Sequence, residues 1–214
     1  DDGAAAGAGR GGVRRGECRC AWGGAGGRGE PETVRRVEVL LNEFEVTAED
    51  RPVVGKARGE ARTAETKAGK GHKGVFCGAA LLLPDGETVV VGHNSPLLHA
   101  ASSLVLNAAK HLAGIPEHLD LISRNVIESI GHLRKDILGR DSISLNLENT
   151  MIALSISATT NPVAQQALEQ LSNLRGCEMH LTHLPSPGDE KGLRRLGVNL
   201  TCDAQLASDK LFMS

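Results

Sequence analysis

The sequence predicts an α/β protein, a three-layer sandwich around a mixed sheet, and three observations carry the prediction. An apolar run over residues 75–83, the turn signal Pro84-Asp85-Gly86 and a second apolar run over 87–92 indicate a β-hairpin. An amphipathic helix follows directly, and strand and helix patterns then alternate to residue 202. A hairpin is antiparallel, whereas the later strands arrive through helical crossovers, so the sheet is expected to be mixed.

Two segments precede the hairpin. Residues 1–31 are mainly Gly, Ala and Arg without apolar periodicity, which predicts a disordered leader because little surface can be buried. Residues 32–73 are expected to form a helical connector. Its first helix is indicated by apolar spacing over 34–44, and its second, over 51–67, is poor in large apolar residues and is expected to be a surface helix or connector. The α/β domain is then expected to span 74–214.

The central helix is predicted to start at Ser95-Pro96 and to run to Gly114. Serine caps a free helical N–H, and proline at the first helical position loses nothing by lacking one. One face of this helix is apolar at helical spacing, and it is expected to pack on the hairpin. That face consists of Leu97, Leu98, Ala101, Leu104, Val105, Ala108 and Leu112.

Caps and breakers predict the remaining elements in order. They are a short strand over 118–122, a helix over 124–138 capped by Ser123, a helix over 145–159, a helix restarted by Asn161-Pro162 and running to 174, a strand over 177–184, a helix capped by Asp189 and ended by Gly197, and a last strand over 198–202. In the helix over 145–159, Leu147, Met151, Ile152, Leu154 and Ile156 are expected to be buried.

Composition narrows the functional classes. The formal net charge is -2, so no electrostatic footprint for nucleic acid or a membrane surface is present. No apolar run approaches the roughly 20 residues that span a bilayer. Five cysteines at irregular spacing favour free thiols in a reducing compartment. We therefore expect a cytoplasmic protein without nucleic-acid or membrane partners and without a cofactor, and we leave homo-oligomer formation open.

Familiar catalytic and metal motifs are missing. Gly7-x-Gly9-x-x-Gly12 formally matches a dinucleotide fingerprint, but no strand precedes it. Cys177-x-x-His180-x-x-His183 has metal-like spacing, yet side chains alternate along a strand and His180 would point away from the other two. Cys77, inside the apolar strand, is expected to be a small core residue. We predict no metal site, and no catalytic residue can be named.

A polar stripe on the central helix is the best candidate for a ligand site. His99, Ser103, Asn107 and Lys110 follow one another at steps of four, four and three, along one edge of the helix. The stripe is either a solvated helix face or a site for a small anionic ligand. Its far wall would come from the break before Pro162, whose candidate residues are Ser155, Ser157, Thr159 and Asn161. The alternative for that break is a kink filled by its own side chains.

Long stretches of this chain resemble a known family. Three segments are similar to the C-terminal part of the bacterial uncharacterised protein family 0371, a family of unknown function: FCGAALLLPDGETVVVGHNSPLLHAASSLVLNAAKHLAGIPEHLDLIS, IESIGHLRKDILG and the segment from Ala153 to Ala204. The resemblance implies a C-terminal fragment with a cytidine-deaminase-like topology. It does not imply the deaminase reaction, because His99-Ala100-Ala101 stands where a His-Ala-Glu zinc motif would, and the Pro-Cys-x-x-Cys ligands are absent.

Two functional hypotheses follow. In the first, the chain is a ligand-binding or interaction domain of a larger cytosolic protein. In the second, it is part of an enzyme whose active site is shared with the missing N-terminal domain and takes a small anionic or nucleotide-like substrate.

Overall fold

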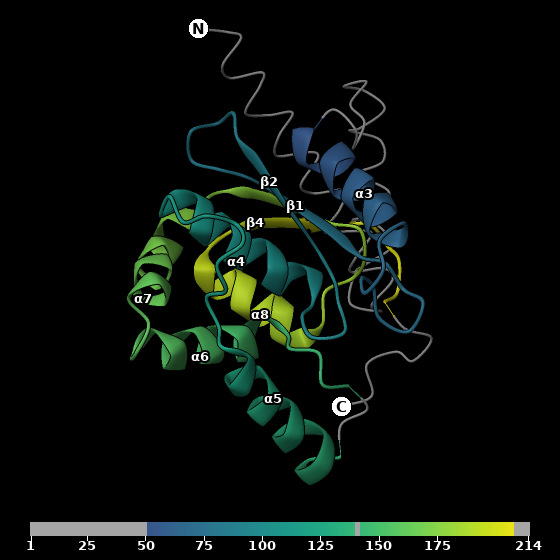
Figure 1. Ribbon diagram of the computed structural model, residues 1–214. Helices are drawn as coiled ribbons and strands as arrows, with labels where there is room; N and C mark the ends of the chain where they lie inside the picture. The colour runs from purple at the N-terminus through teal and green to yellow at the C-terminus, as the bar shows by residue number, and fades with distance from the viewer. Residues whose placement is uncertain (1–50, 140–141, 208–214) are drawn as a thin grey trace, which may run out of the picture.

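The computed structural model describes residues 51–139 and 142–207 (Figure 1). The elements are α3 (Pro52–Glu65), β1 (Gly78–Leu82), β2 (Val89–His93), α4 (Ala100–Leu112), α5 (Arg124–His132), the π-helical η2 (Leu133–Ile137), α6 (Leu147–Ala158), α7 (Pro162–Glu169), the 3-10 helix η3 (Gln170–Leu174), β3 (Glu178–Leu181), α8 (Pro187–Leu196) and β4 (Asn199–Cys202). The strands form one open sheet in the order β2-β1-β3-β4. α3 covers one face, and α4 and α8 cover the other, with α5, α6 and α7 outside them. The predicted three-layer α/β sandwich is confirmed.

The hairpin and the mixed sheet form as predicted. β1 pairs antiparallel with β2 and with β3, and β3 pairs parallel with β4. In the turn between β1 and β2, the Asp85 carboxylate accepts hydrogen bonds from the N–H groups of Glu87 and Thr88, and Gly86 has a φ of +76°. The hairpin register is therefore set by side chains next to it in sequence.

Two glycines allow the helices to rest directly on the sheet backbone. A Cβ at Gly78 would lie 2.1 Å from the carbonyl oxygen of Ala57 in α3. A Cβ at Gly92 would lie 2.5 Å from the backbone nitrogen of Leu104 in α4. Atoms do not approach so closely, so each helix packs where the strand has no side chain.

The surface helix predicted over 51–67 forms as α3, and one of its faces is buried against the sheet. Val53, Val54 and Ala57 are at most 1% exposed and pack against Ala80 and its neighbours in the sheet. Ion pairs join the N-cap residue Arg51 to Glu178, and Arg58 within the helix to Asp203. The buried side chains of α3 are only valines and alanines, and close approach to the sheet at Gly78 compensates for their small volume.

The central helix begins later than predicted, at Ala100, with His99 as its N-cap residue. Ser95 closes a turn instead, and its Oγ accepts the N–H groups of Leu97 and Leu98. The backbone after this turn pairs with a distant segment. Leu145 N–H donates to the Leu97 carbonyl at 2.8 Å, and His99 N–H donates to the Leu145 carbonyl at 3.0 Å. Those bonds hold residues 97–99 extended.

The outer helices correct three further expectations. Residues 118–122 form no strand, and Leu121 and Ile122 are buried in the outer apolar cluster instead. Ser123 makes no side-chain cap hydrogen bond. In α6, Leu147 and Leu154 are buried, as predicted, and Met151 is half-buried. The predicted burial of Ile152 and Ile156 is wrong, because these side chains are 57% and 49% exposed. An outer helix is covered on one side, so it cannot bury every apolar residue.

Other expectations are not tested. The leader over 1–31 and the helix over 34–44 lie outside the described residues. The three-part division of the chain and the cytidine-deaminase-like topology stay predictions. Within the described ranges, no helix is both long and apolar enough to cross a membrane.

Candidate functional site

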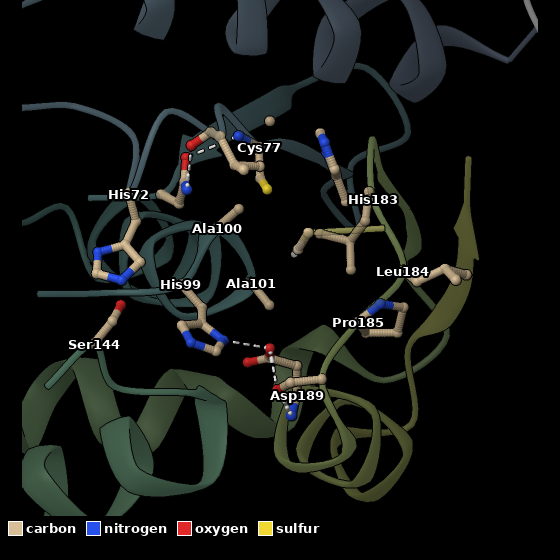
Figure 2. A pocket seen from close by; sticks show the side chains of 16 residues that line it. His72, Cys77, His99, Ala100, Ala101, Ser144, His183, Leu184, Pro185 and Asp189 are labelled. Atoms are coloured by element: carbon tan, nitrogen blue, oxygen red, sulfur yellow. Dashed lines mark hydrogen bonds and ion pairs between the residues drawn. The ribbon is translucent and has the colours of Figure 1, made fainter. Parts of the chain in front are cut away.

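A pocket of 120 Å³ opens where the N-terminal end of α4 meets the loop that leads into α8 (Figure 2). Its walls come from segments far apart in the sequence. The lining residues that carry polar or sulfur-containing side chains are His72, Cys77, Asn94, His99, Ser144, His183, Ser186 and Asp189. Apolar side chains complete the walls, among them Leu181, Leu184 and Pro185.

The pair of His99 and Asp189 forms the centre of this site. His99 Nδ1 lies 2.7 Å from Asp189 Oδ2, and Ser186 Oγ donates to the same oxygen at 2.6 Å. The N–H of Leu147 donates to Asp189 Oδ1 at 2.8 Å. Burial by itself would raise the pKa of Asp189, but the hydrogen bonds from His99, Ser186 and Leu147 outweigh it and lower that pKa. The ionised carboxylate holds a proton on Nδ1 of His99 and leaves Nε2 available.

Three helix N-termini meet at this carboxylate. His99 is the N-cap of α4, Leu147 opens α6, and Asp189 lies in the first turn of α8. Ser186 caps α8 by accepting the N–H of Asp189. Gly188 leaves room for the Asn146 side chain, since a Cβ there would lie 2.1 Å from Nδ2 of Asn146. The positive ends of the helices favour an anionic side chain at this point.

Cys77 lies across the cavity from His99 (Figure 2). Its backbone is held by Asn94, whose Oδ1 accepts the Cys77 N–H at 2.8 Å. Burial, and then the charge of Asp189, raise the pKa of the Cys77 thiol to about 12. Cys77 therefore faces the pocket as a neutral thiol and not as a thiolate nucleophile.

We expect Cys77 to react slowly with iodoacetamide. At pH 7.5 its alkylation should be at least about a hundredfold slower in the folded chain than in urea, because the thiolate is the reactive form and a free thiol has a pKa near 8.5. Mass spectrometry of the peptide that contains Cys77 measures both rates, and the unfolded chain is the matched control. Rates within tenfold of one another would contradict the burial of this thiol.

The polar stripe predicted on the central helix leaves the pocket after His99. Ser103 is half-buried one turn further along α4. Asn107 Nδ2 donates to the carbonyl of Val91 on the edge strand at 2.9 Å, and Lys110 Nζ donates to the carbonyl of Glu117 at 2.9 Å. Asn107 and Lys110 therefore have internal partners, and the structure brings His99 alone of these four residues to the pocket wall.

The other four candidates lie at the junction of α6 and α7, outside the pocket lining. Asn161 caps α7 by accepting the N–H of Val163, and Thr159 donates to the carbonyl of Ile156. Ser157 is buried and Ser155 is exposed. Local hydrogen bonding at the break agrees with the kink alternative. A ligand site built from all eight residues stays a prediction.

Sequence reasoning missed most of the pocket. The helix cap predicted at Asp189 is Ser186 instead, and Asp189 lies in the first turn of α8. Cys77 belongs to the apolar core, as predicted, but it also lines the pocket, and His72 and Ser186 were not predicted there. The run Ser186-Pro187-Gly188-Asp189 does signal an acid in a first helical turn. No local signal joins it to His99, which lies 90 residues away.

Cys177 and His180, two residues of the metal-like spacing in and beside β3, lie in separate environments. His180 is fully buried, with Nδ1 3.0 Å from Thr201 Oγ1, whereas Cys177 belongs to the apolar cluster on the opposite face of the sheet. In the part of the chain that the structure describes, no three His, Cys, Asp or Glu side chains are grouped to hold a metal ion. Folding without zinc stays a prediction.

Comparison with known proteins decides the family. The sequence pattern described as "Domain of unknown function DUF1846, C-terminal" matches residues 49–212. The chain belongs to the DUF1846 family. A UPF0371 protein of Clostridium tetani is 38% identical over 183 residues, which are 86% of this chain and 36% of that protein. UPF0371 proteins of two Clostridium botulinum strains, Langeland and Alaska E43, are 37% and 38% identical over 86% and 87% of this chain and 36% of each relative.

The UPF0371 relatives, together with the DUF1846 assignment, confirm the resemblance to uncharacterised family 0371. The chain spans about a third of the length of the curated relatives it matches, 36%. His99 and Asp189 both lie inside the matched residues. The family name assigns no activity, so the site itself must supply the functional argument.

Proposed function

We propose that this chain is a small-ligand-binding part of a longer protein, and that the ligand occupies the pocket between His99 and Cys77. The observation that carries the proposal is the His99–Asp189 pair, an imidazole oriented at a cavity wall by a buried, fully hydrogen-bonded carboxylate. Ionisable pairs of this kind in a cavity are typical of functional sites.

The groups that face the pocket favour a ligand with acceptor oxygens. Asp189 uses both oxygens on internal donors, and Asn94 uses both ends of its amide on backbone groups around Cys77. Among the remaining groups are the neutral thiol of Cys77 and Nε2 of His99, which donates when the imidazole carries protons on both nitrogens. Ala100 and Ala101 also line the pocket, and their N–H groups, the first of α4, have no acceptor inside the helix. A carboxylate or a phosphate satisfies such donors.

We expect acetate or inorganic phosphate to bind the full chain saturably, and the replacement His99→Asn to weaken that binding by about tenfold, the loss of one charge-assisted hydrogen bond. The measurement is a titration followed by NMR at constant ionic strength. His111→Asn is the matched control, because His111 is exposed in the last turn of the same helix. Absence of saturable shifts at the pocket, or equal binding to the His99 variant, would rule the site out.

A second candidate function is an enzyme whose active site is completed by the rest of the longer protein. The same pair favours it, because an imidazole held at Nδ1 by a buried carboxylate and open at Nε2 is suited to act as a general base. Its substrate would be a small anionic or nucleotide-like molecule. The test is to mix this chain with the remaining region of a UPF0371 protein. We expect the mixture to turn over phosphate esters or nucleotides, neither part to do so by itself, and His99→Asn to abolish the activity.

Cytoplasmic location and the set of partners belong to this proposal as well. Cys77 and Cys177 are free and buried, which supports a reducing compartment. The partner that the proposal requires is the remaining region of the longer protein. Binding without nucleic acid or membranes, and assembly with a second copy, stay predictions.

A further inference from the structure

We propose that a second ligand site lies in the groove beside α3 and that it binds a phosphate group. The groove is 520 Å³ in volume and lies between α3, Phe76 and the segments 182–183 and 203–205. It meets the pocket at His183, which lines both hollows. Figure 2 shows the His183 ring directed away from His99, toward the helix that covers the other face of the sheet.

Thr182 determines which nitrogen of His183 carries a proton. Thr182 Oγ1 accepts the N–H of Gly78 at 2.9 Å and lies 2.9 Å from His183 Nδ1. Thr182 is 4% exposed, and its single O–H proton has no other described acceptor, so it is donated to Nδ1. Burial lowers the pKa of His183, which keeps the ring neutral at pH 7. The ring proton is then on Nε2, a hydrogen-bond donor.

α3 provides the positive charge on the opposite wall. Arg58 and Arg62 are one turn apart and both line the groove. Arg58 is compensated, since its Nε and Nη2 donate to the Asp203 carboxylate at 3.1 and 2.9 Å. Arg62 is exposed and forms no ion pair or side-chain hydrogen bond with any residue in the described ranges. The two arginines and Asp203 leave one net positive charge.

This arrangement suits a tetrahedral oxyanion. A guanidinium on one wall and a fixed N–H donor on the other can contact different oxygens of one phosphate, and Gln205 adds an amide to the lining. Asp203 is the acidic residue among the described lining residues, and its carboxylate is already engaged by Arg58 and by His180, whose Nε2 lies 3.3 Å away. Repulsion of a bound phosphate by Asp203 is thereby reduced.

The test is an NMR titration of the full chain with inorganic phosphate at constant ionic strength. We expect saturable shifts at His183 and Arg62, and a dissociation constant about tenfold higher in Arg62→Gln, the loss of one charge-assisted contact. Lys56→Gln is the matched control, because Lys56 is an exposed cation of the same helix outside the groove. It should change the dissociation constant by less than about twofold.

The outcomes separate this site from the pocket. Phosphate shifts at His183 that persist in His99→Asn and weaken in Arg62→Gln support the groove. Shifts lost only in His99→Asn place phosphate in the pocket and overturn the groove proposal, as do equal effects of Lys56→Gln and Arg62→Gln or the absence of saturation. Repetition with methyl phosphate distinguishes the sources, since tighter binding than that of inorganic phosphate indicates a phosphate ester and weaker binding the free ion.

Discussion

Replacement of Gly78 by alanine is expected to destabilise the protein by about 3 kcal/mol, the upper end of the usual cost of overpacking. The added Cβ would lie 2.1 Å from the Ala57 carbonyl oxygen and 2.6 Å from the Ala61 backbone nitrogen. These are helix backbone atoms, so no side chain can rotate away. α3 is also tied to the sheet by the ion pairs of Arg51 and Arg58, so it cannot retreat without breaking them.

Urea denaturation of Gly78→Ala measures this effect as a lower midpoint at an unchanged m-value. Gly59→Ala is the matched control on α3, because a Cβ there meets nothing within 4 Å. Alanine is the better helix former by about 1 kcal/mol, so that variant should be neutral or more stable. A loss below about 1 kcal/mol in Gly78→Ala would mean that α3 does not rest on this strand.

Replacement of Asp189 by alanine should cost about 3 kcal/mol, the penalty for leaving buried donors without an acceptor. The Leu147 N–H, the Ser186 hydroxyl and His99 Nδ1 would all lose their partner at once. Asp136→Asn is the matched control. Asp136 also pairs with a histidine, Nδ1 of His132 at 2.6 Å, but both side chains are more than half exposed, so its removal should cost less than about 0.5 kcal/mol.

The Asp189 effect should depend on pH in a defined direction. Because the folded-state pKa of Asp189 is lowered, its contribution to stability is fully present above the unfolded pKa of about 4 and is lost as the pH falls through the folded value. The difference in unfolding free energy between wild type and Asp189→Ala should therefore shrink on acidification below pH 4. Urea denaturation at pH 7, 4 and 3 measures it. A difference that grows with acidification would contradict the ionised state.

Much of the secondary structure was predictable because its determinants are local. Asp85 closes the hairpin through the next two N–H groups, Asn161 caps α7 through Val163, and Gly197 ends α8 with a φ of +75°. Each of these devices joins a side chain or a special backbone angle to residues a few positions away. Both partners of each interaction are therefore close together in the sequence.

The features that the sequence did not show depend on remote partners. The start of α4 depends on hydrogen bonds between residues 97–99 and Leu145, and the burial of α3 depends on the bare backbone of Gly78. Each interaction joins segments that are far apart in the sequence, and neither produces a periodic pattern of residues. The local cap signal at Ser95 was therefore overruled by tertiary contacts.

The same distinction between local and remote determinants applies to the chemistry of the site. The sequence was sufficient to predict the α/β class, the family resemblance and His99 as a candidate site residue. These predictions depend on apolar spacing and on the order of motifs, which can be read directly along the chain. The His99–Asp189 pair, the neutral thiol of Cys77 and the donor at His183 arise from packing. Hydrogen bonds and burial set these protonation states, and their partners meet only when α4, α6, α8 and the sheet come together.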